Sequence, residues 1–153
     1  MASNERTRDL MRLLTGTQVL FNLYRTVRWR AQDATPFETR VIFDEHYRGQ
    51  FELFDALARH VVALGGVDAI TPTRIVRSTA AFDTQGRGCA AEHLSLLLAA
   101  HETVLAETRT LTRAASALRS GSTVEIVTRV AQANEIQRRF VADRLTARGR
   151  ARS

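Results

Sequence analysis

Apolar residues recur at spacings of three and four along most of the chain, which is the period of an amphipathic helix. No segment alternates with the period of a strand. The pattern therefore predicts four long helices of roughly 27 to 30 residues each. The predicted core positions are Leu10, Leu13, Leu14, Leu20, Phe21 and Tyr24; Phe43, Tyr47, Phe51, Phe54, Leu57, Val61 and Leu64; Leu94, Leu97, Leu98, His101, Leu105, Leu111 and Leu118; and Val127, Val130, Ala131, Phe140 and Val141.

Capping signals and glycines separate the four segments. Thr35-Pro36 is typical of a helix start, Gly65-Gly66 of a helix end, and Ser122 with Glu125 of a second capping box. The first pair and the last pair of helices are joined by short links. Residues 67–88 are too many for a tight turn, and Pro72 opens a short helix that is expected to end near Ala81. We predict an all-α four-helix bundle with one long crossover between helices 2 and 3, the ferritin-like arrangement.

The composition predicts one globular domain, residues 1–153, with basic mobile tails at about 1–8 and 146–153. All 22 basic residues are arginine, and against 16 acidic residues they leave a net charge of +6. Arginine favours planar partners such as phosphate and carboxylate. No apolar run is long enough to span a membrane and the N-terminus is charged, so we expect a cytoplasmic protein. The single cysteine, Cys89, excludes an internal disulfide framework.

Motifs of common enzyme classes are missing from the sequence. It has no G-x-S-x-G, no P-loop, no dinucleotide fingerprint and no C-x-x-C. The histidines His46, His60, His93 and His101 do not repeat a metal-binding spacing, and we interpret them as hydrogen-bonded structural residues. A displaced metal site at Asp44, Glu45 and His46 is the less favoured alternative.

The stretch from Tyr24 to Gly66 resembles the Dps family, which comprises mini-ferritins that assemble as dodecamers. In that family the first helix ends in a His-Trp pair. The second helix carries F-x-x-x-H-x-x-x-D, then eleven residues later D-x-x-x-E, and a final L-G-G. Trp29, Asp44 and Asp55 match the family's tryptophan and two aspartates, and Leu64-Gly65-Gly66 matches the closing turn. The resemblance implies an iron site at a two-fold dimer interface, with Trp29 as its aromatic residue.

Three positions depart from the family pattern. Arg28 and Arg40 stand where the resemblance places histidine ligands, and Arg59 stands where it places a glutamate. Arginine has no acceptor atom and stays protonated, so it cannot coordinate iron. Of the implied metal ligands only Asp44 and Asp55 remain, and the site is expected to be degenerate.

Charged residues at this site are spaced for mutual pairing. Arg40 and Asp44, Asp44 and Arg48, and Asp55 and Arg59 are each four residues apart, which places each pair on one helix face. We hypothesise that ion pairs have replaced the metal and that Arg28 and Arg40 face Asp55 of a neighbouring subunit.

The resemblance and the basic ends together predict a cage, expected to be a dodecamer, that binds and protects DNA without sequence preference. The expected DNA contacts are Arg6, Arg8, Arg144, Arg148, Arg150 and Arg152. By resemblance, Glu125 lies where the family lines a pore with acidic side chains. Two alternatives stay open: oxidation and storage of iron through a non-standard site, and a structural subunit that assembles with an active sister chain.

Overall fold

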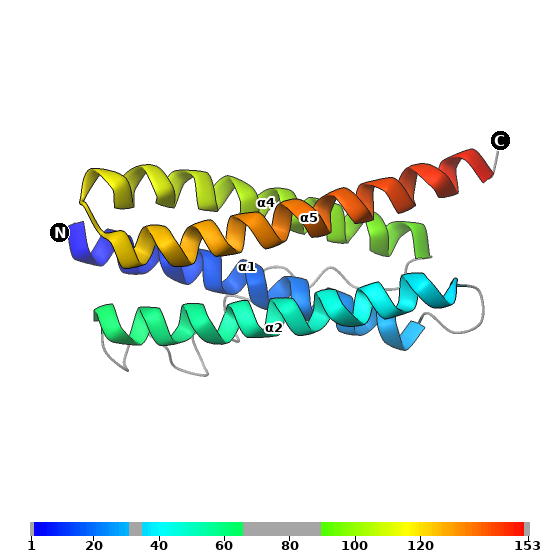
Figure 1. Ribbon diagram of the computed structural model, residues 1–153, viewed down its shortest axis with the longest axis horizontal. Helices are drawn as coiled ribbons and strands as arrows, with labels where there is room; N and C mark the ends of the chain where they lie inside the picture. Colours follow the sequence, from blue (N-terminus) through cyan, green and yellow to red (C-terminus); the bar gives the residue numbers. More distant parts are fainter. Residues whose placement is uncertain (1, 31–34, 66–89, 152–153) are drawn as a thin grey trace.

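The structure, a computed structural model, describes residues 2–30, 35–65 and 90–151. In these ranges the chain forms four long helices, α1 (Ala2–Arg30), α2 (Phe37–Gly65), α4 (Ala90–Ala117) and α5 (Gly121–Ala151) (Figure 1). None of the described residues forms a strand. The predicted all-α bundle is confirmed, whereas the predicted short helix from Pro72 to Ala81 lies outside the described residues.

The four helices run along a common long axis (Figure 1). α1 and α2 are antiparallel, and so are α4 and α5, while α2 and α4 point the same way. The end of α2 and the start of α4 therefore lie at opposite ends of the bundle. This is the one-crossover arrangement that the long middle connection predicts. α1 packs extensively against α2 and α4, α4 packs against α5, and α2 and α5 pack less closely.

A continuous apolar core fills the space between the helices. Leucines and valines from all four helices are almost fully buried, as are most of the predicted core positions. Phe51 and Leu118 are exceptions, because 53% and 46% of their surfaces remain exposed. Gly16 allows a close approach of α1 to α4: a Cβ atom there would lie 2.7 Å from a methyl group of Val104.

Both basic ends of the chain are helical over the described residues. α1 begins at Ala2 and α5 continues to Ala151, so over the described residues both basic ends form the outer turns of bundle helices. The two ends also lie at opposite ends of the molecule (Figure 1). The predicted basic regions are thus separated within one chain by the length of the bundle.

The helix boundaries differ from the predicted caps by one or two residues. Pro36 accepts the first helical hydrogen bond of α2, from Arg40, so Thr35 lies one residue outside the cap. At α5 the cap is Ser120, whose carbonyl accepts from the Val124 N–H at 3.0 Å. The prediction of a capping box at Ser122 is therefore wrong, because Ser122 already lies inside the helix.

The end of α4 closes with a Schellman motif. The Ser120 N–H donates to the carbonyl of Ala115 at 3.0 Å, and the Arg119 N–H donates to Ser116 at 3.1 Å. Arg119 carries the left-handed backbone of this motif, with φ at 52°. Glycine adopts that conformation without the steric penalty that a Cβ atom brings.

Replacing Arg119 with glycine should therefore stabilise the protein by about 1 kcal/mol, measured as a higher midpoint of urea unfolding. Arg113→Gly is the matched control, because it places glycine in the exposed interior of α4 and should cost about 1 kcal/mol. A destabilised Arg119→Gly protein would contradict the interpretation of this turn.

Candidate functional site

The site implied by the family resemblance lies on the outer side of α1 and α2, around Asp44. One carboxylate oxygen of Asp44 accepts from Arg28 of α1 at 2.6 Å, and the other accepts from Arg48 at 2.8 Å. The Arg28 guanidinium also stacks over the ring of Tyr47, 4.9 Å from its centroid. Asp44 is thus held between two guanidinium groups that come from different helices.

Arg40 lies in the same hollow but does not pair with Asp44. The hollow is lined by Arg28, Phe37, Arg40 and Asp44, among others. The Arg40 guanidinium lies 5.8 Å from the ring centroid of Phe37, and Arg40 is not among the ion pairs of the described residues. The predicted pair of Arg40 and Asp44 is therefore wrong: Asp44 pairs with Arg28 and Arg48 instead, and the Arg40 guanidinium lies by Phe37.

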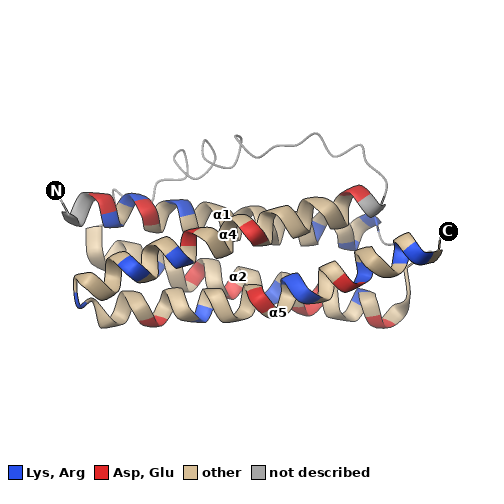
Figure 2. Cartoon of the chain, turned by 90° about the horizontal axis from the view of Figure 1, so that it is seen from above, with Lys and Arg blue, Asp and Glu red and all other residues tan. Residues whose placement is uncertain are grey.

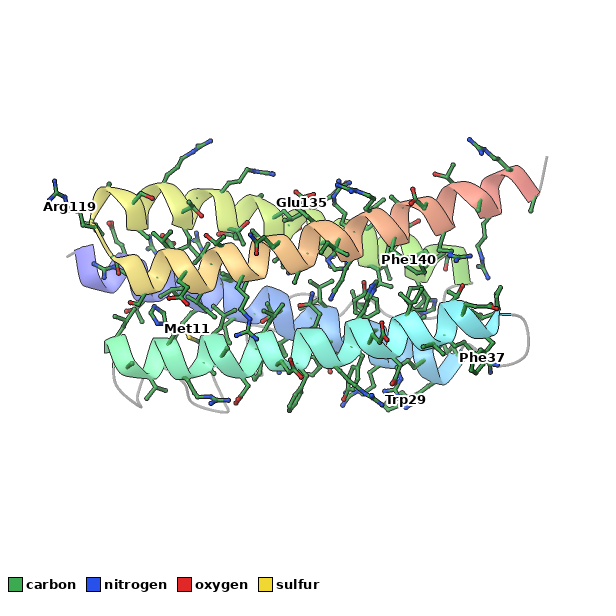
Figure 3. All side chains as sticks on the ribbon, viewed as in Figure 1. Met11, Trp29, Phe37, Arg119, Glu135 and Phe140 are labelled. Carbon is green, nitrogen blue, oxygen red and sulfur yellow. The ribbon has the colours of Figure 1, made fainter. Side chains whose placement is uncertain are left out.

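Trp29 and Phe37 project from the bundle near the end of α1 and at the start of α2 (Figure 3). About two thirds of each side chain is exposed. The guanidinium of Arg25 covers the Trp29 ring at 5.1 Å. The implied site aromatic therefore lies largely at the surface, beside an arginine.

Asp55 and Arg59 form the second half of the predicted site. They are ion-paired, one turn apart on α2, and both are largely solvent-accessible. Asp55 lies eleven residues after Asp44, which is about 16 Å further along the helix axis. The structure thus confirms two of the three predicted pairs, and within one chain it keeps the two halves of the site apart.

Of the residues at the implied ligand positions, only Asp44 and Asp55 carry atoms that can coordinate iron, since arginine has no acceptor atom. Among the described residues there is no group of three or more His, Cys, Asp or Glu side chains close enough to share a metal ion. The alternative at Glu45 and His46 fails for a geometric reason, since Glu45 is exposed whereas His46 is buried in the bundle. At the predicted position, three arginines and two aspartates leave a net positive charge that repels a cation.

The predicted DNA contacts divide between the two ends of the bundle (Figure 2). Arg144, Arg148 and Arg150 lie on the last turns of α5, where basic residues gather, and Arg152 is outside the described residues. At the other end Arg8 is exposed and Arg6 is half-buried, with its Nε atom buried and unpaired.

Glu125 lies one turn into α5, at the end of the bundle opposite to Arg148. Its side chain is exposed. It is not the reciprocal half of a capping box, since Ser120 caps the helix. Glu125 therefore has no local capping role.

A buried chain of hydrogen bonds crosses the centre of the bundle and joins all four helices. The Tyr24 hydroxyl of α1 lies 2.6 Å from Nε2 of His101 on α4 and 3.1 Å from Nδ1 of His46 on α2. Nδ1 of His101 lies 2.8 Å from Oδ1 of Asn134 on α5. Gln50 of α2 donates to the same oxygen at 3.2 Å, so the chain reaches α2 at both of its ends.

The amide of Asn134 and the neutral form of His101 together determine the direction of the hydrogen bonds in this chain. The Asn134 amide nitrogen donates to the carbonyl of Val130 at 2.8 Å, so its oxygen is the acceptor for Nδ1 of His101. With His101 neutral, as its burial favours, Nε2 accepts the Tyr24 proton and the Tyr24 oxygen accepts from Nδ1 of His46.

Burial favours the neutral form of all three titratable groups. It lowers the pKa of His46 to about 4 and, as the largest cause, that of His101 to about 4. It also raises the pKa of Tyr24 well above its ordinary value. The structural interpretation of these two histidines agrees with this geometry. We did not predict Gln50 and Asn134 as buried polar residues, although a polar residue within the apolar stripe of a helix is a usable signal of one.

Comparisons with known proteins agree with the fold. Residues 8–148 match the model of the ferritin-like domain family. A relative from Kitasatospora aureofaciens, described as an uncharacterised protein in the bpoA2 5′ region, is 40% identical over 101 residues, which are 65% of this chain and 67% of the relative.

Two solved structures are similar over 94% of this chain. DpsC from Streptomyces coelicolor has 29% sequence identity and a TM-score of 0.83, with 85% of its own chain covered. Dps from Thermosynechococcus elongatus has a TM-score of 0.85 with 92% of its chain covered, and at 19% identity it shows the fold alone.

The buried imidazoles predict that the protein loses stability in acid. An unfolded chain binds protons to both histidines near the ordinary pKa of 6.5, whereas the folded chain does so only near 4. Stability is therefore full above about pH 7 and falls as the pH drops toward 4. Between pH 7.5 and pH 5 each imidazole should cost about 2 kcal/mol in urea unfolding.

His101→Gln is the control for this prediction, because it removes one of the two titrating groups. Its free energy of unfolding should change with pH about half as much as that of the wild type from this source. A wild-type stability that stays flat over this range would show that the imidazoles are not held neutral.

Proposed function

This chain belongs to the ferritin-like domain family and is similar throughout to its Dps members, and from that premise we propose that it forms a basic protein cage which binds DNA without sequence preference and lacks the family's iron-oxidising site. The observation that carries the proposal is the state of Asp44. Each of its carboxylate oxygens pairs with a guanidinium group, from Arg28 and from Arg48, and these two positive charges beside the carboxylate disfavour a metal cation there.

The outer face of α1 and α2 supports assembly with other subunits. Trp29, Phe37, Val41 and Phe51 are large apolar side chains that remain 42% to 67% exposed there. Exposed apolar patches of this kind mark interaction surfaces. The arginine and aspartate pairs lie among them, so a partner that covers the patch also shields those pairs from solvent. We propose that the partner is a second copy of the chain, and that the cage contains twelve copies.

Charge supports the choice of DNA as the partner of the cage. The chain carries six net positive charges, all its cations are arginine, and the last turns of α5 are basic. Guanidinium groups bind phosphate oxygens with two parallel hydrogen bonds. Many copies on one cage multiply weak contacts, because the second and later contacts are intramolecular. Such a protein would act in the cytoplasm, in association with the nucleoid.

DNA retardation across a salt series tests this proposal. Binding of duplex DNA should weaken at least about tenfold between about 50 and 200 mM NaCl, because each neutralised phosphate releases counterions. Arg148→Gln with Arg150→Gln should weaken binding and reduce the salt slope by about 0.9 for each phosphate that the variant no longer neutralises. The matched control is Arg129→Gln with Arg139→Gln, which removes the same charge from exposed positions earlier in α5.

Affinity that does not change with salt, or equal weakening in the two double variants, would contradict the assigned contacts. A sizing column run on each protein shows whether the assembly is the same in all three, so that weaker DNA binding is not mistaken for disassembly of the cage.

A further inference from the structure

The hydrogen-bonded chain in the centre of the bundle contains a phenol beside a positioned base. Tyr24 has no exposed surface, and its hydroxyl lies 2.6 Å from Nε2 of His101. This distance is at the short end of the range for hydrogen bonds in proteins. Asn134 orients the imidazole by accepting from its Nδ1 atom at 2.8 Å, so Nε2 faces the phenol as the proton acceptor.

The Tyr24 oxygen has a hydrogen-bond donor as well as an acceptor. Nδ1 of His46 lies 3.1 Å from it, on the donating side. The ring of Tyr24 packs against the rings of Phe43, His46 and His101, with centroids 5.2 to 5.8 Å apart. If the phenol gives its proton to His101, the remaining oxygen therefore keeps a hydrogen bond from His46.

Burial limits the reactions in which this pair can take part. Tyr24 and His101 are both 0% exposed, so a substrate molecule does not reach either of them. An electron needs no such contact, and only one helix layer, about 10 Å thick, separates the bundle centre from solvent. Burial also raises the pKa of Tyr24 well above its ordinary value, so the phenol is protonated at neutral pH. Its oxidation then requires a base that takes the proton, and His101 is placed for that role.

We propose that Tyr24 and His101 form a one-electron donor site that intercepts oxidising radicals at the protein surface. The oxidant belongs to the class of oxygen-centred radicals, such as the hydroxyl radical. It takes one electron from Tyr24 and becomes hydroxide, while the phenol O–H bond breaks and its proton forms a bond to Nε2 of His101. The products are a neutral phenoxyl radical, an imidazolium cation and hydroxide, so atoms and charge balance.

The neighbouring side chains are arranged to hold these products without rearrangement. An imidazolium donates from both nitrogens, to the phenoxyl oxygen and to Oδ1 of Asn134. Burial lowers the pKa of His101 to about 4, so the imidazolium returns its proton once Tyr24 regains an electron. A soluble thiolate supplies that electron and becomes a thiyl radical. This activity is additional to the proposed cage and does not depend on DNA binding.

Flash photolysis with ruthenium tris-bipyridine and persulfate tests the site on the full-length protein, because it produces a one-electron oxidant in solution. The chain has two tyrosines, so Tyr47→Phe leaves Tyr24 as the single one. This variant should keep the persistent phenoxyl absorption and electron paramagnetic resonance spectrum of the wild type, since a buried ring does not couple to a second radical. Ring-deuterated tyrosine should narrow that spectrum. Tyr24→Phe should lose it.

His101→Gln tests the role of the base. Glutamine keeps an acceptor for the Tyr24 hydroxyl but does not take its proton. Radical formation should slow at least about tenfold, because a positioned base contributes about 10²- to 10⁴-fold to such steps. The matched control is His60→Gln, which removes an imidazole that bonds to Thr123 instead, and it should leave the rate unchanged. A purely structural role for His101 would lower stability in urea without slowing the oxidation.

Four results would overturn the proposal. They are the absence of a phenoxyl radical from the Tyr47→Phe protein, a persistent tyrosine signal of wild-type size in Tyr24→Phe, an unchanged rate in His101→Gln, and a spectrum that does not respond to deuterated tyrosine. The last would place the radical on Trp29, the single tryptophan. Tyr47→Phe leaves the chain through Tyr24 intact, so its result does not depend on whether the His101 variant folds. DNA retardation is measured separately, so the two proposals fail independently.

Discussion

The hydrogen-bonded chain through the Tyr24 hydroxyl is the constraint on which the rest of the bundle depends. It joins all four helices, and each buried donor has its acceptor only in one register of those helices. A slip of one turn between α1 and α2 would separate Tyr24 from His46 and leave buried polar atoms unpaired. The same register determines the surface: Arg28 lies one turn after Tyr24 and, because α1 and α2 are antiparallel, it meets Asp44, two residues before His46.

This alignment explains why the outer face of α1 and α2 has a different chemistry from an iron site. A carboxylate that faces two guanidinium groups is satisfied electrostatically, and further cations are repelled from it. The replaced ligands therefore do more than remove donor atoms, since Arg28 also places a positive charge against the carboxylate that remains. The pairs are half-exposed in a single chain, so their contribution to stability there is small. On an interface, where a partner removes them from water, the loss of one member of a pair would cost more, because it would leave a buried charge without its counter-ion.

The sequence was sufficient for the architecture because periodicity and connection length are both local in the chain. Four apolar stripes and one long link predict the bundle, and the match around Trp29, Asp44 and Asp55 predicts the family. The ion-pair partners of Asp44 were harder to predict. Spacing within α2 shows that Arg40 and Asp44 can meet, but it says nothing of a contact with Arg28 on α1. The hydrogen-bonded chain through Tyr24 was not predicted for a similar reason. Gln50 and Asn134 are 84 positions apart, and only the packed fold brings them together. Phe51 fits a core pattern and its ring lies 5.9 Å from that of Phe21, yet about half of the residue stays exposed on the outer face of α1 and α2.

The central claim is that arginine has eliminated iron chemistry at this position. The most direct test is the rate of ferrous iron oxidation by the metal-free protein, with peroxide and with oxygen, beside a triple variant that carries Arg28→His, Arg40→His and Arg59→Glu. This variant restores the ligand types that the family resemblance implies. We expect the wild type to oxidise iron no faster than buffer and the triple variant to exceed it. Clear turnover by the wild type would contradict the account, because it would require iron ligands other than those that the structure brings together.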